Sequence, residues 1–235
     1  ALSSAASDVY KRQIIDDFLK SQDVERLDVV VATHMHADHI GSMAEVIDSY
    51  DIGAFYMPDQ QAESNAYEDM MDALEAKDVP VVTAKLLPTD TGPMQVDWAA
   101  DVETVILSPF DGTYDDANDY SIVLRVRYGE TAALFTGDAE ATAERIALRA
   151  LPHHYFKADV LKAGHHGSSS STCDAFLAAV DPQLAVISCG KDNSYGHPHR
   201  ETLERLRAAS VQVLRTDEVG TVHIALDGAA VRVVE

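Results

Sequence analysis

Three histidines and an aspartate lie within six residues of the chain, directly after a run of valines. The stretch reads VVVATHMHADHIG and contains His34, His36, Asp38 and His39. Imidazole and carboxylate are the side chains that bind zinc, iron and manganese in proteins. In this spacing His34 and His36 can flank one ion, while Asp38 and His39 turn toward a second. The cluster therefore predicts a site for divalent metal ions at the end of a strand.

Three further polar segments also follow apolar stretches. They are LFTGDAE with Asp138, GHHGS with His165 and His166, and YGHPH with His197 and His199. In a layered α/β sheet, loops at the same ends of adjacent strands converge on one rim, where ligands bind. We therefore expect these segments to join the first cluster. A carboxylate such as Asp138 could then bridge two cations about 3.5–4 Å apart.

Helical and extended patterns alternate along the chain. Amphipathic stretches predict helices over 14–20, 43–50, 63–77, 139–150, 174–180 and 201–209. Apolar runs predict strands over 27–32, 52–57, 79–87, 101–110, 158–163, 183–188 and 211–214, with hairpins turned at Gly129-Glu130 and Asp227-Gly228. Tyr67, Met70, Met71 and Leu74 share one helical face, and we expect that stripe to pack in the core. The alternation predicts an α/β layered domain.

The composition fits a globular protein with an acidic surface. The 235 residues are 46% hydrophobic and 24% charged, and the net charge is −21. This charge argues against a basic surface that grips nucleic acid, although bound divalent cations can supply local positive charge. Cys173 and Cys189 make neither a disulfide framework nor a thiolate zinc site. Because no run of about 18 apolar residues appears, we expect no membrane span in this chain.

The motifs resemble those of the metallo-β-lactamase superfamily. THMHADHIG resembles its HxHxDH signature, LFTGDAE its bridging aspartate, and LKAGHHGS its late histidine ligand. NDYSIVLRVRYG, VISCGKDNSYGHPH and TDEVGTVHI more closely resemble the hydrolase domain of the ComEC competence proteins and their stand-alone relatives. The resemblance covers about residue 14 to the end and implies an αββα sandwich domain over 14–235. Residues 1–13 are interpreted as a non-native or disordered leader, and the first N-terminal strands of the fold as missing.

The resemblance also implies two divalent metal ions, zinc or manganese, and a set of ligands. The metal ligands would be His34, His36, Asp38, His39, Asp138 and His165. We assign the metal to His165, which directly follows the strand and its Gly, and a substrate contact to His166. The residues expected to be catalytic are Asp38, Asp138 and His197, with His197 in proton transfer or in contact with a substrate oxygen.

Two features of the site are less regular. No histidine lies between His39 and His153, where many superfamily members carry another ligand. By position, Asn118 is the expected substitute, with Asp119 next, and an oxygen ligand favours manganese or magnesium over zinc. Ser168 and the serines after it could bind an anionic group near a helix start, although ordinary helix capping explains them equally well.

Other polar residues are predicted to be structural. We expect Lys162, on the strand before GHHGS, to extend its ammonium group into solvent. His199 is expected at a helix start, and His153, His154 and His223 are expected to be structural or at the surface.

In the ComEC family the proposed chemistry is phosphodiester hydrolysis of DNA, and the resemblance implies it here. The alternatives are hydrolysis of another small ester or phosphoester, which the acidic net charge favours, and a non-catalytic metal-stabilised binding domain. The resemblance further implies a location at a membrane or outside the cytoplasm, with a membrane channel domain as a partner absent from this chain.

Overall fold

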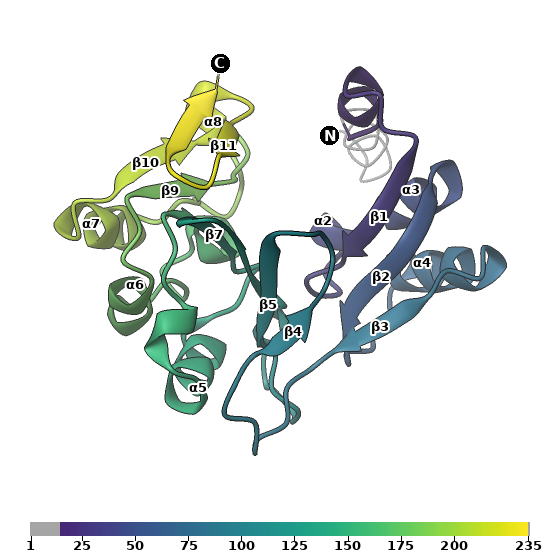
Figure 1. Cartoon of the computed structure of the whole chain (residues 1–235), viewed down its shortest axis with the longest axis horizontal. Helices are drawn as coiled ribbons and strands as arrows, with labels where there is room; N and C mark the ends of the chain where they lie inside the picture. The colour runs from purple at the N-terminus through teal and green to yellow at the C-terminus, as the bar shows by residue number, and fades with distance from the viewer. Residues whose placement is uncertain (1–14, 235) are drawn as a thin grey trace. The chain divides into compact units, whose positions relative to one another are not determined.

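The computed structural model describes residues 15–234, and the chain divides into two compact units (Figure 1). The first unit ends at Thr83 and the second begins at Ala84. The leader predicted over 1–13 lies outside the described residues. The division of the chain into a leader and one domain over 14–235 stays a prediction.

The first unit is a three-stranded sheet with helices on one face (Figure 1). Its strand order is β1 (Arg26–Val31), β2 (Asp51–Pro58) and β3 (Val81–Ala84). Its helices are 15–21, α2 (Ala37–Ile40), α3 (Met43–Ser49) and α4 (Asn65–Ala76). Strands β1 and β2 pair in parallel, with Val29 opposite Ala54. Two parallel strands need a crossover connection, and α2 and α3 provide it.

The core of the first unit lies between its sheet and α4. Met70 and Leu74 are buried there with Phe55, while Tyr67 and Met71 are partly buried against the same cluster. The predicted core stripe on this helix is therefore confirmed. The helix begins where the Ser64 hydroxyl accepts a hydrogen bond from the Tyr67 backbone N–H, which satisfies a donor of the first turn.

The second unit contains a seven-stranded sheet in the order β10-β9-β8-β7-β6-β5-β4. These strands are β4 (Met94–Val96), β5 (Val102–Ser108), β6 (Val123–Tyr128), β7 (Thr131–Phe135), β8 (Val160–Lys162), β9 (Leu184–Ile187) and β10 (Gln212–Arg215). The strands from β7 to β10 pair in parallel, and those from β4 to β7 pair antiparallel. The predicted hairpin at Gly129-Glu130 is the β6–β7 pair.

Helices connect and flank this sheet. They are α5 (Ala141–Ala150), α6 (Asp174–Val180), α7 (Arg200–Ala208) and α8 (Thr216–Val219), with 3₁₀ turns η1 (Ala117–Tyr120), η2 (His153–Tyr155) and η3 (Gly164–Gly167). The predicted second hairpin is the antiparallel pair β11 (His223–Leu226) and β12 (Val231–Val234). Its residues Ile224, Leu226 and Val231 pack against a cluster of Ala133, Val160 and Leu184 from the seven-stranded sheet. The hairpin therefore covers part of one sheet face.

Two short elements differ from the sequence expectations. No strand was predicted between residues 87 and 101, yet Met94–Val96 pairs antiparallel with β5 as the last strand of the sheet. The strand expected over 79–87 ends at Ala84, after which Leu86 makes an isolated bridge to Phe110. Both segments depend on pairing with distant residues, so hydrophobic periodicity does not reveal them.

The topology of the second unit brings four polar segments to one edge of its sheet. Because β7, β8 and β9 are parallel, the segments after them lie at the same edge. Strand β6 is antiparallel to β7, so η1, which precedes β6, lies at that edge as well. This edge therefore carries Asn118, Asp138, the His165-His166 pair and His197.

Candidate metal centre

The first histidine cluster follows β1 and is held by short backbone contacts. The Met35 side chain is buried in the core of the first unit, and its backbone N–H donates to Gln60 Oε1 at 3.0 Å. His36 is the N-cap of α2, and its carbonyl accepts hydrogen bonds from the N–H groups of His39 and Ile40. A buried methionine and a helix start thus fix the backbone on both sides of His36.

The imidazole rings of His34, His36 and His39 lie together. The ring centroids are 4.8 Å apart for His34 and His36, and 4.2 Å apart for His34 and His39. His34 Nε2 and His36 Nδ1 are 3.1 Å apart. Two nitrogens bound to one tetrahedral zinc at 2.0–2.1 Å would lie roughly 3.3 Å apart. This pair therefore has a spacing that fits two ligands of a single ion.

Asp38 and His39 form the second part of this cluster. Asp38 Oδ2 lies 3.8 Å from His39 Nε2, and about half of the Asp38 side chain is exposed. His39 Nδ1 and His34 Nδ1 both face the Thr33 hydroxyl, at 3.4 and 3.2 Å. The hydroxyl thus lies between the two rings and orients them from one side.

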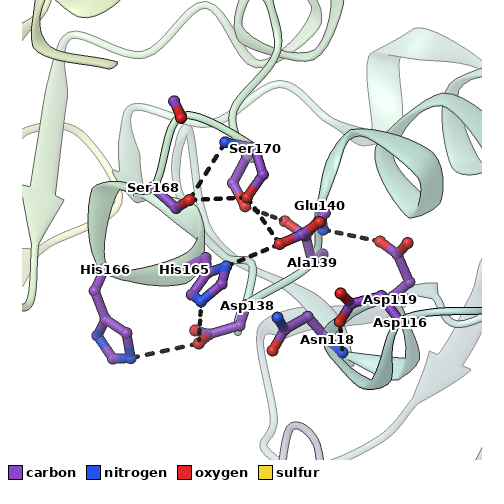
Figure 2. Close-up of polar contacts among 12 residues, drawn as sticks. Asp116, Asn118, Asp119, Asp138, Ala139, Glu140, His165, His166, Ser168 and Ser170 are labelled. Carbon is purple, nitrogen blue, oxygen red and sulfur yellow. Dashed lines mark hydrogen bonds and ion pairs between the residues drawn. The ribbon is translucent and has the colours of Figure 1, made fainter. Parts of the chain in front are cut away.

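Asp138 is a buried carboxylate of the second unit, at the edge that carries the histidine pair (Figure 2). Its backbone N–H donates to Ser121 Oγ at 3.0 Å, and the preceding Gly137 has a φ of +53°, which favours glycine. Lys162 Nζ donates to the Gly137 carbonyl at 2.7 Å and lies 3.5 Å from Asp138 Oδ1. The expectation that Lys162 extends into solvent is therefore wrong, because its ammonium group faces the carboxylate instead.

His165 and His166 sit on a strained backbone. Their φ angles are +46° and +53°, in the left-handed region that non-glycine residues rarely occupy. Such residues cost about 1–3 kcal/mol each and persist only where the surroundings impose them. Here Gly164 and Gly167 flank the pair, and a Cβ on Gly167 would lie 2.6 Å from Pro198 Cβ. Close packing on both sides thus holds this turn in place.

The partners of these two histidines fix which ring nitrogen carries the proton. His165 Nδ1 lies 3.0 Å from Glu140 Oε1, and His166 Nδ1 lies 2.8 Å from the Ser188 carbonyl (Figure 2 shows the first pair). A carbonyl oxygen and an ionised carboxylate only accept hydrogen bonds, so each neutral imidazole is protonated at Nδ1. In this form Nε2 is the nitrogen without a proton in each ring, which is the form in which an imidazole binds a metal ion.

Both Nε2 atoms face the same oxygen of Asp138. The distance to Asp138 Oδ2 is 3.4 Å for His166 and 4.0 Å for His165 (Figure 2). A lone pair facing a carboxylate is unfavourable unless a proton or a cation lies between them. These donors thus fit a divalent cation, and the His166 distance is close to the roughly 3.3 Å expected for two ligands of one tetrahedral ion. The assignment of the metal to His165 stays a prediction, and the distances favour His166.

Glu140 is a site residue that sequence reasoning missed. One of its oxygens, Oε1, faces His165 Nδ1 and also accepts a hydrogen bond from Ser170 Oγ at 2.8 Å (Figure 2). Glu140 is also the N-cap residue of α5. Carboxylates in this position orient a histidine and raise its basicity. The available signal was its place two residues after Asp138, at the start of the next helix.

Asn118 and Asp119 have different surroundings. Asp119 Oδ1 accepts hydrogen bonds from the backbone N–H groups of Glu140 and Ala143, so its carboxylate caps the start of α5. Burial, the largest influence, raises the pKa of Asp119. Asn118 is also buried, and no donor reaches its Oδ1 among the residues that the structure describes. Asp119 is tied to the start of α5 through Oδ1, so the geometry favours Asn118 of the two candidates for the missing histidine.

His197 lies beside the histidine pair. Its ring centroid is 5.3 Å from that of His165 and 6.3 Å from that of His166. Burial lowers the pKa of His197, and the neighbouring histidines His165, His199 and His166 lower it further. The ring is therefore more readily neutral near pH 7 than an ordinary histidine, and a neutral ring can accept a proton.

Ser168 and the remaining histidines make contacts that support the fold or lie at the surface. Ser168 is buried, and its hydroxyl is hydrogen-bonded to Ser170 Oγ at 2.8 Å (Figure 2), so its predicted contact with substrate stays a prediction. His199 is the N-cap residue of α7, as expected. The three histidines expected to be structural or at the surface are exposed, namely His153, His154 and His223.

The chain belongs to the metallo-β-lactamase superfamily, whose family model matches residues 5–191. ComE operon protein 3 of Bacillus subtilis (strain 168) is 31% identical over 211 residues, which are 90% of this chain and 26% of that protein. Competence protein ComA of Neisseria gonorrhoeae is 30% identical over 215 residues, 91% of this chain and 27% of that protein. The predicted resemblance to competence proteins is therefore confirmed. The chain spans about a quarter of the length of these curated relatives.

A solved structure supports the same fold. The metallo-β-lactamase fold protein YhfI of Bacillus subtilis matches with a TM-score of 0.51 at 11% identity, over 86% of this chain and 80% of that chain. The predicted metallo-β-lactamase fold is confirmed. In residues 15–234, every helix is too short or too polar to span a bilayer.

Proposed function

We propose that this chain is a metal-dependent phosphodiesterase that acts on DNA. The observation that carries the proposal is the donor set around Asp138, where two imidazole Nε2 atoms face one buried carboxylate oxygen. The superfamily supports hydrolysis, and the relatives named as competence proteins favour DNA as the substrate.

The proposed ligands are described for each unit by itself. In the first unit, His34 and His36 would hold a divalent ion, and Asp38 and His39 would also bind metal. In the second unit, Asp138 and an imidazole of the His165-His166 pair would hold a divalent ion. The Asn118 oxygen would take the place of the missing histidine, which favours manganese over zinc.

The residues of the chain then have separate tasks in hydrolysis. When bound, divalent ions would neutralise phosphate oxygens and make an attacking water more acidic. Asp38 would orient that water for in-line attack. His197, whose pKa is lowered by burial, would accept or deliver a proton. Lys162 would hold the Asp138 carboxylate in place through its 3.5 Å contact with Oδ1.

The acidic charge limits how such a chain can bind DNA. A net charge of −21 opposes long contacts with a phosphate backbone, so the chain by itself should prefer short strands. The same observation favours the second candidate, hydrolysis of another small phosphoester. In this proposal the partner of the chain is a membrane channel domain, which would deliver the DNA strand to it.

The test is turnover as a function of metal. The chain is treated with EDTA and then given manganese or zinc, and initial rates are measured on bis-p-nitrophenyl phosphate, p-nitrophenyl phosphate and p-nitrophenyl acetate. A phosphodiesterase should hydrolyse the diester fastest, lose that activity in EDTA and regain it with metal. Preference for the monoester or the acetate would favour the second candidate. A metal-dependent melting temperature without turnover on any substrate would show a non-catalytic module.

A further inference from the structure

Tyr195 is an exposed aromatic side chain at the edge of the sheet that carries the proposed site. It lies in the segment after β9, between Ser188 and His199. Its side chain is 76% exposed, more than any other large apolar side chain in residues 15–234. A single exposed ring is common on protein surfaces, so the position of Tyr195 beside the histidines of the proposed site, rather than its exposure, points to a ligand.

The Tyr195 ring belongs to a stack that leads toward Asp138. Its centroid lies 5.8 Å from that of His197 at an interplanar angle of 22°. His197 in turn lies 6.3 Å from His166, also at 22°. Both separations are within the range of stacked rings. His197 thus lies against one side of the Tyr195 ring, and most of the tyrosine stays exposed to a ligand.

The segment that presents this ring is braced. Asn193 Nδ2 donates to the carbonyls of Gly190 and His197 at 2.9 and 2.6 Å, and Asn193 Oδ1 accepts from the His197 N–H at 3.0 Å. His199 Nε2 lies 3.3 Å from the Tyr195 carbonyl. These contacts hold the backbone on both sides of the ring, so less conformational entropy of the segment is lost when a ligand binds.

We propose that Tyr195 stacks on an unpaired base of a single-stranded nucleic acid, close to the phosphodiester that is cleaved. The inference rests on the proposed function. Every base has a π-face, but in a duplex its neighbours cover that face, so the partner must be unpaired. Stacking also does not require positive charge. It therefore gives a chain with a net charge of −21 a way to hold a strand that it cannot grip through phosphates.

The binding test uses a fluorescent, hydrolysis-resistant phosphorothioate strand of about six thymidine nucleotides, with manganese present. Fluorescence anisotropy gives Kd for the unmodified chain, Tyr195→Ala and Tyr195→Phe. We expect Tyr195→Ala to raise Kd about 5- to 150-fold, because stacking of one base contributes about 1–3 kcal/mol. Tyr195→Phe keeps the ring and should restore most of the affinity. A strand of the same length without bases should bind the unmodified chain and Tyr195→Ala equally.

Tyr155 supplies a matched control. It stacks on His154 with ring centroids 4.2 Å apart, in η2, which precedes β8 and so lies at the opposite edge of the sheet. Tyr155→Ala should leave Kd unchanged. Equal Kd values for the unmodified chain and Tyr195→Ala, or no binding by the unmodified chain, would overturn the inference. If the inference fails but the chain still hydrolyses bis-p-nitrophenyl phosphate, the proposed function stands. If the chain hydrolyses no substrate but its Kd depends on Tyr195, the proposed function fails and the stacking of Tyr195 on a base stands.

Discussion

Replacing Glu144 with glutamine should remove a pH dependence from the free energy of unfolding. Glu144 is buried on α5, and its two carboxylate oxygens accept hydrogen bonds from the backbone N–H groups of Thr172 at 2.5 Å and Cys173 at 2.8 Å. Thr172 Oγ1 in turn accepts from the Gly164 N–H, at the start of the His165-His166 turn. The carboxyl therefore supports the segment that carries both histidines.

The magnitude follows from the pKa of this carboxyl. Burial, the largest influence, raises the pKa of Glu144 from 4.5 to about 7, against the opposing effect of the two N–H donors and Arg205. A group that binds its proton more tightly when folded stabilises the fold most below its unfolded pKa, and that contribution is lost as the pH rises through the folded pKa. The difference corresponds to about 3 kcal/mol, lost between about pH 4.5 and 7.

The assay is urea unfolding followed by circular dichroism, across about pH 4.5 to 7.5 and with EDTA present. Glutamine stays neutral but offers one acceptor oxygen to two N–H groups, which costs about 1 kcal/mol at every pH. The stability of Glu144→Gln relative to the unmodified chain should therefore rise by about 3 kcal/mol over this range. Glu68→Gln, at an exposed helical position, is the control and should show no such rise. A stability difference that stays constant with pH would refute the reasoning.

Four other substitutions test the proposed metal centre. Asp138→Ala should abolish both metal binding and phosphodiesterase activity. His197→Ala should keep its metal content, and its hydrolysis rate should fall by a factor of about 10²–10⁴. Equal loss of metal in both variants would make His197 a ligand. Glu140→Gln should weaken metal binding about 10- to 100-fold in competition with a chelator, because Glu140 orients His165, and unchanged affinity would contradict that role. Asp119→Ala should lower the free energy of unfolding, measured in urea, by about 0.5–2 kcal/mol, because the start of α5 loses its cap. The metal content should not change. A loss of metal would make Asp119 a ligand.

The longer elements could be predicted from sequence because their patterns are local. The helix predicted over 174–180 is α6, Asp174–Val180, and the two hairpins turn at the predicted residues. Met94–Val96 and Thr216–Val219 were missed, since such short elements carry too few residues to show a period. Strand β4 forms through its pairing with β5, and this tertiary contact cannot be predicted from the three residues of β4 alone.

The donor types of the site could also be predicted, whereas the residues that orient them could not. Imidazole and carboxylate in HxHxDH spacing identify metal ligands by chemistry alone. Glu140 and Lys162 act through hydrogen bonds and ion pairs with Ser170, His165, Gly137 and Asp138. Asp119 caps a helix that begins more than twenty residues later in the chain. Such contacts depend on the packing of η1, η3 and α5, and no spacing in the sequence expresses them.

The choice between His165 and His166 shows the same limit at a single turn. Assigning the metal to the residue that directly follows Gly164 assumes that the backbone continues regularly, so that adjacent side chains diverge. Instead both residues adopt left-handed φ angles, and the acceptors at Glu140 and Ser188 hold each Nδ1. Both Nε2 atoms then face Asp138, and the closer one, at 3.4 Å, belongs to His166. A carbonyl behind His166 and a carboxylate behind His165 orient the two rings, so the position of each Nε2 depends on a residue far away in the sequence.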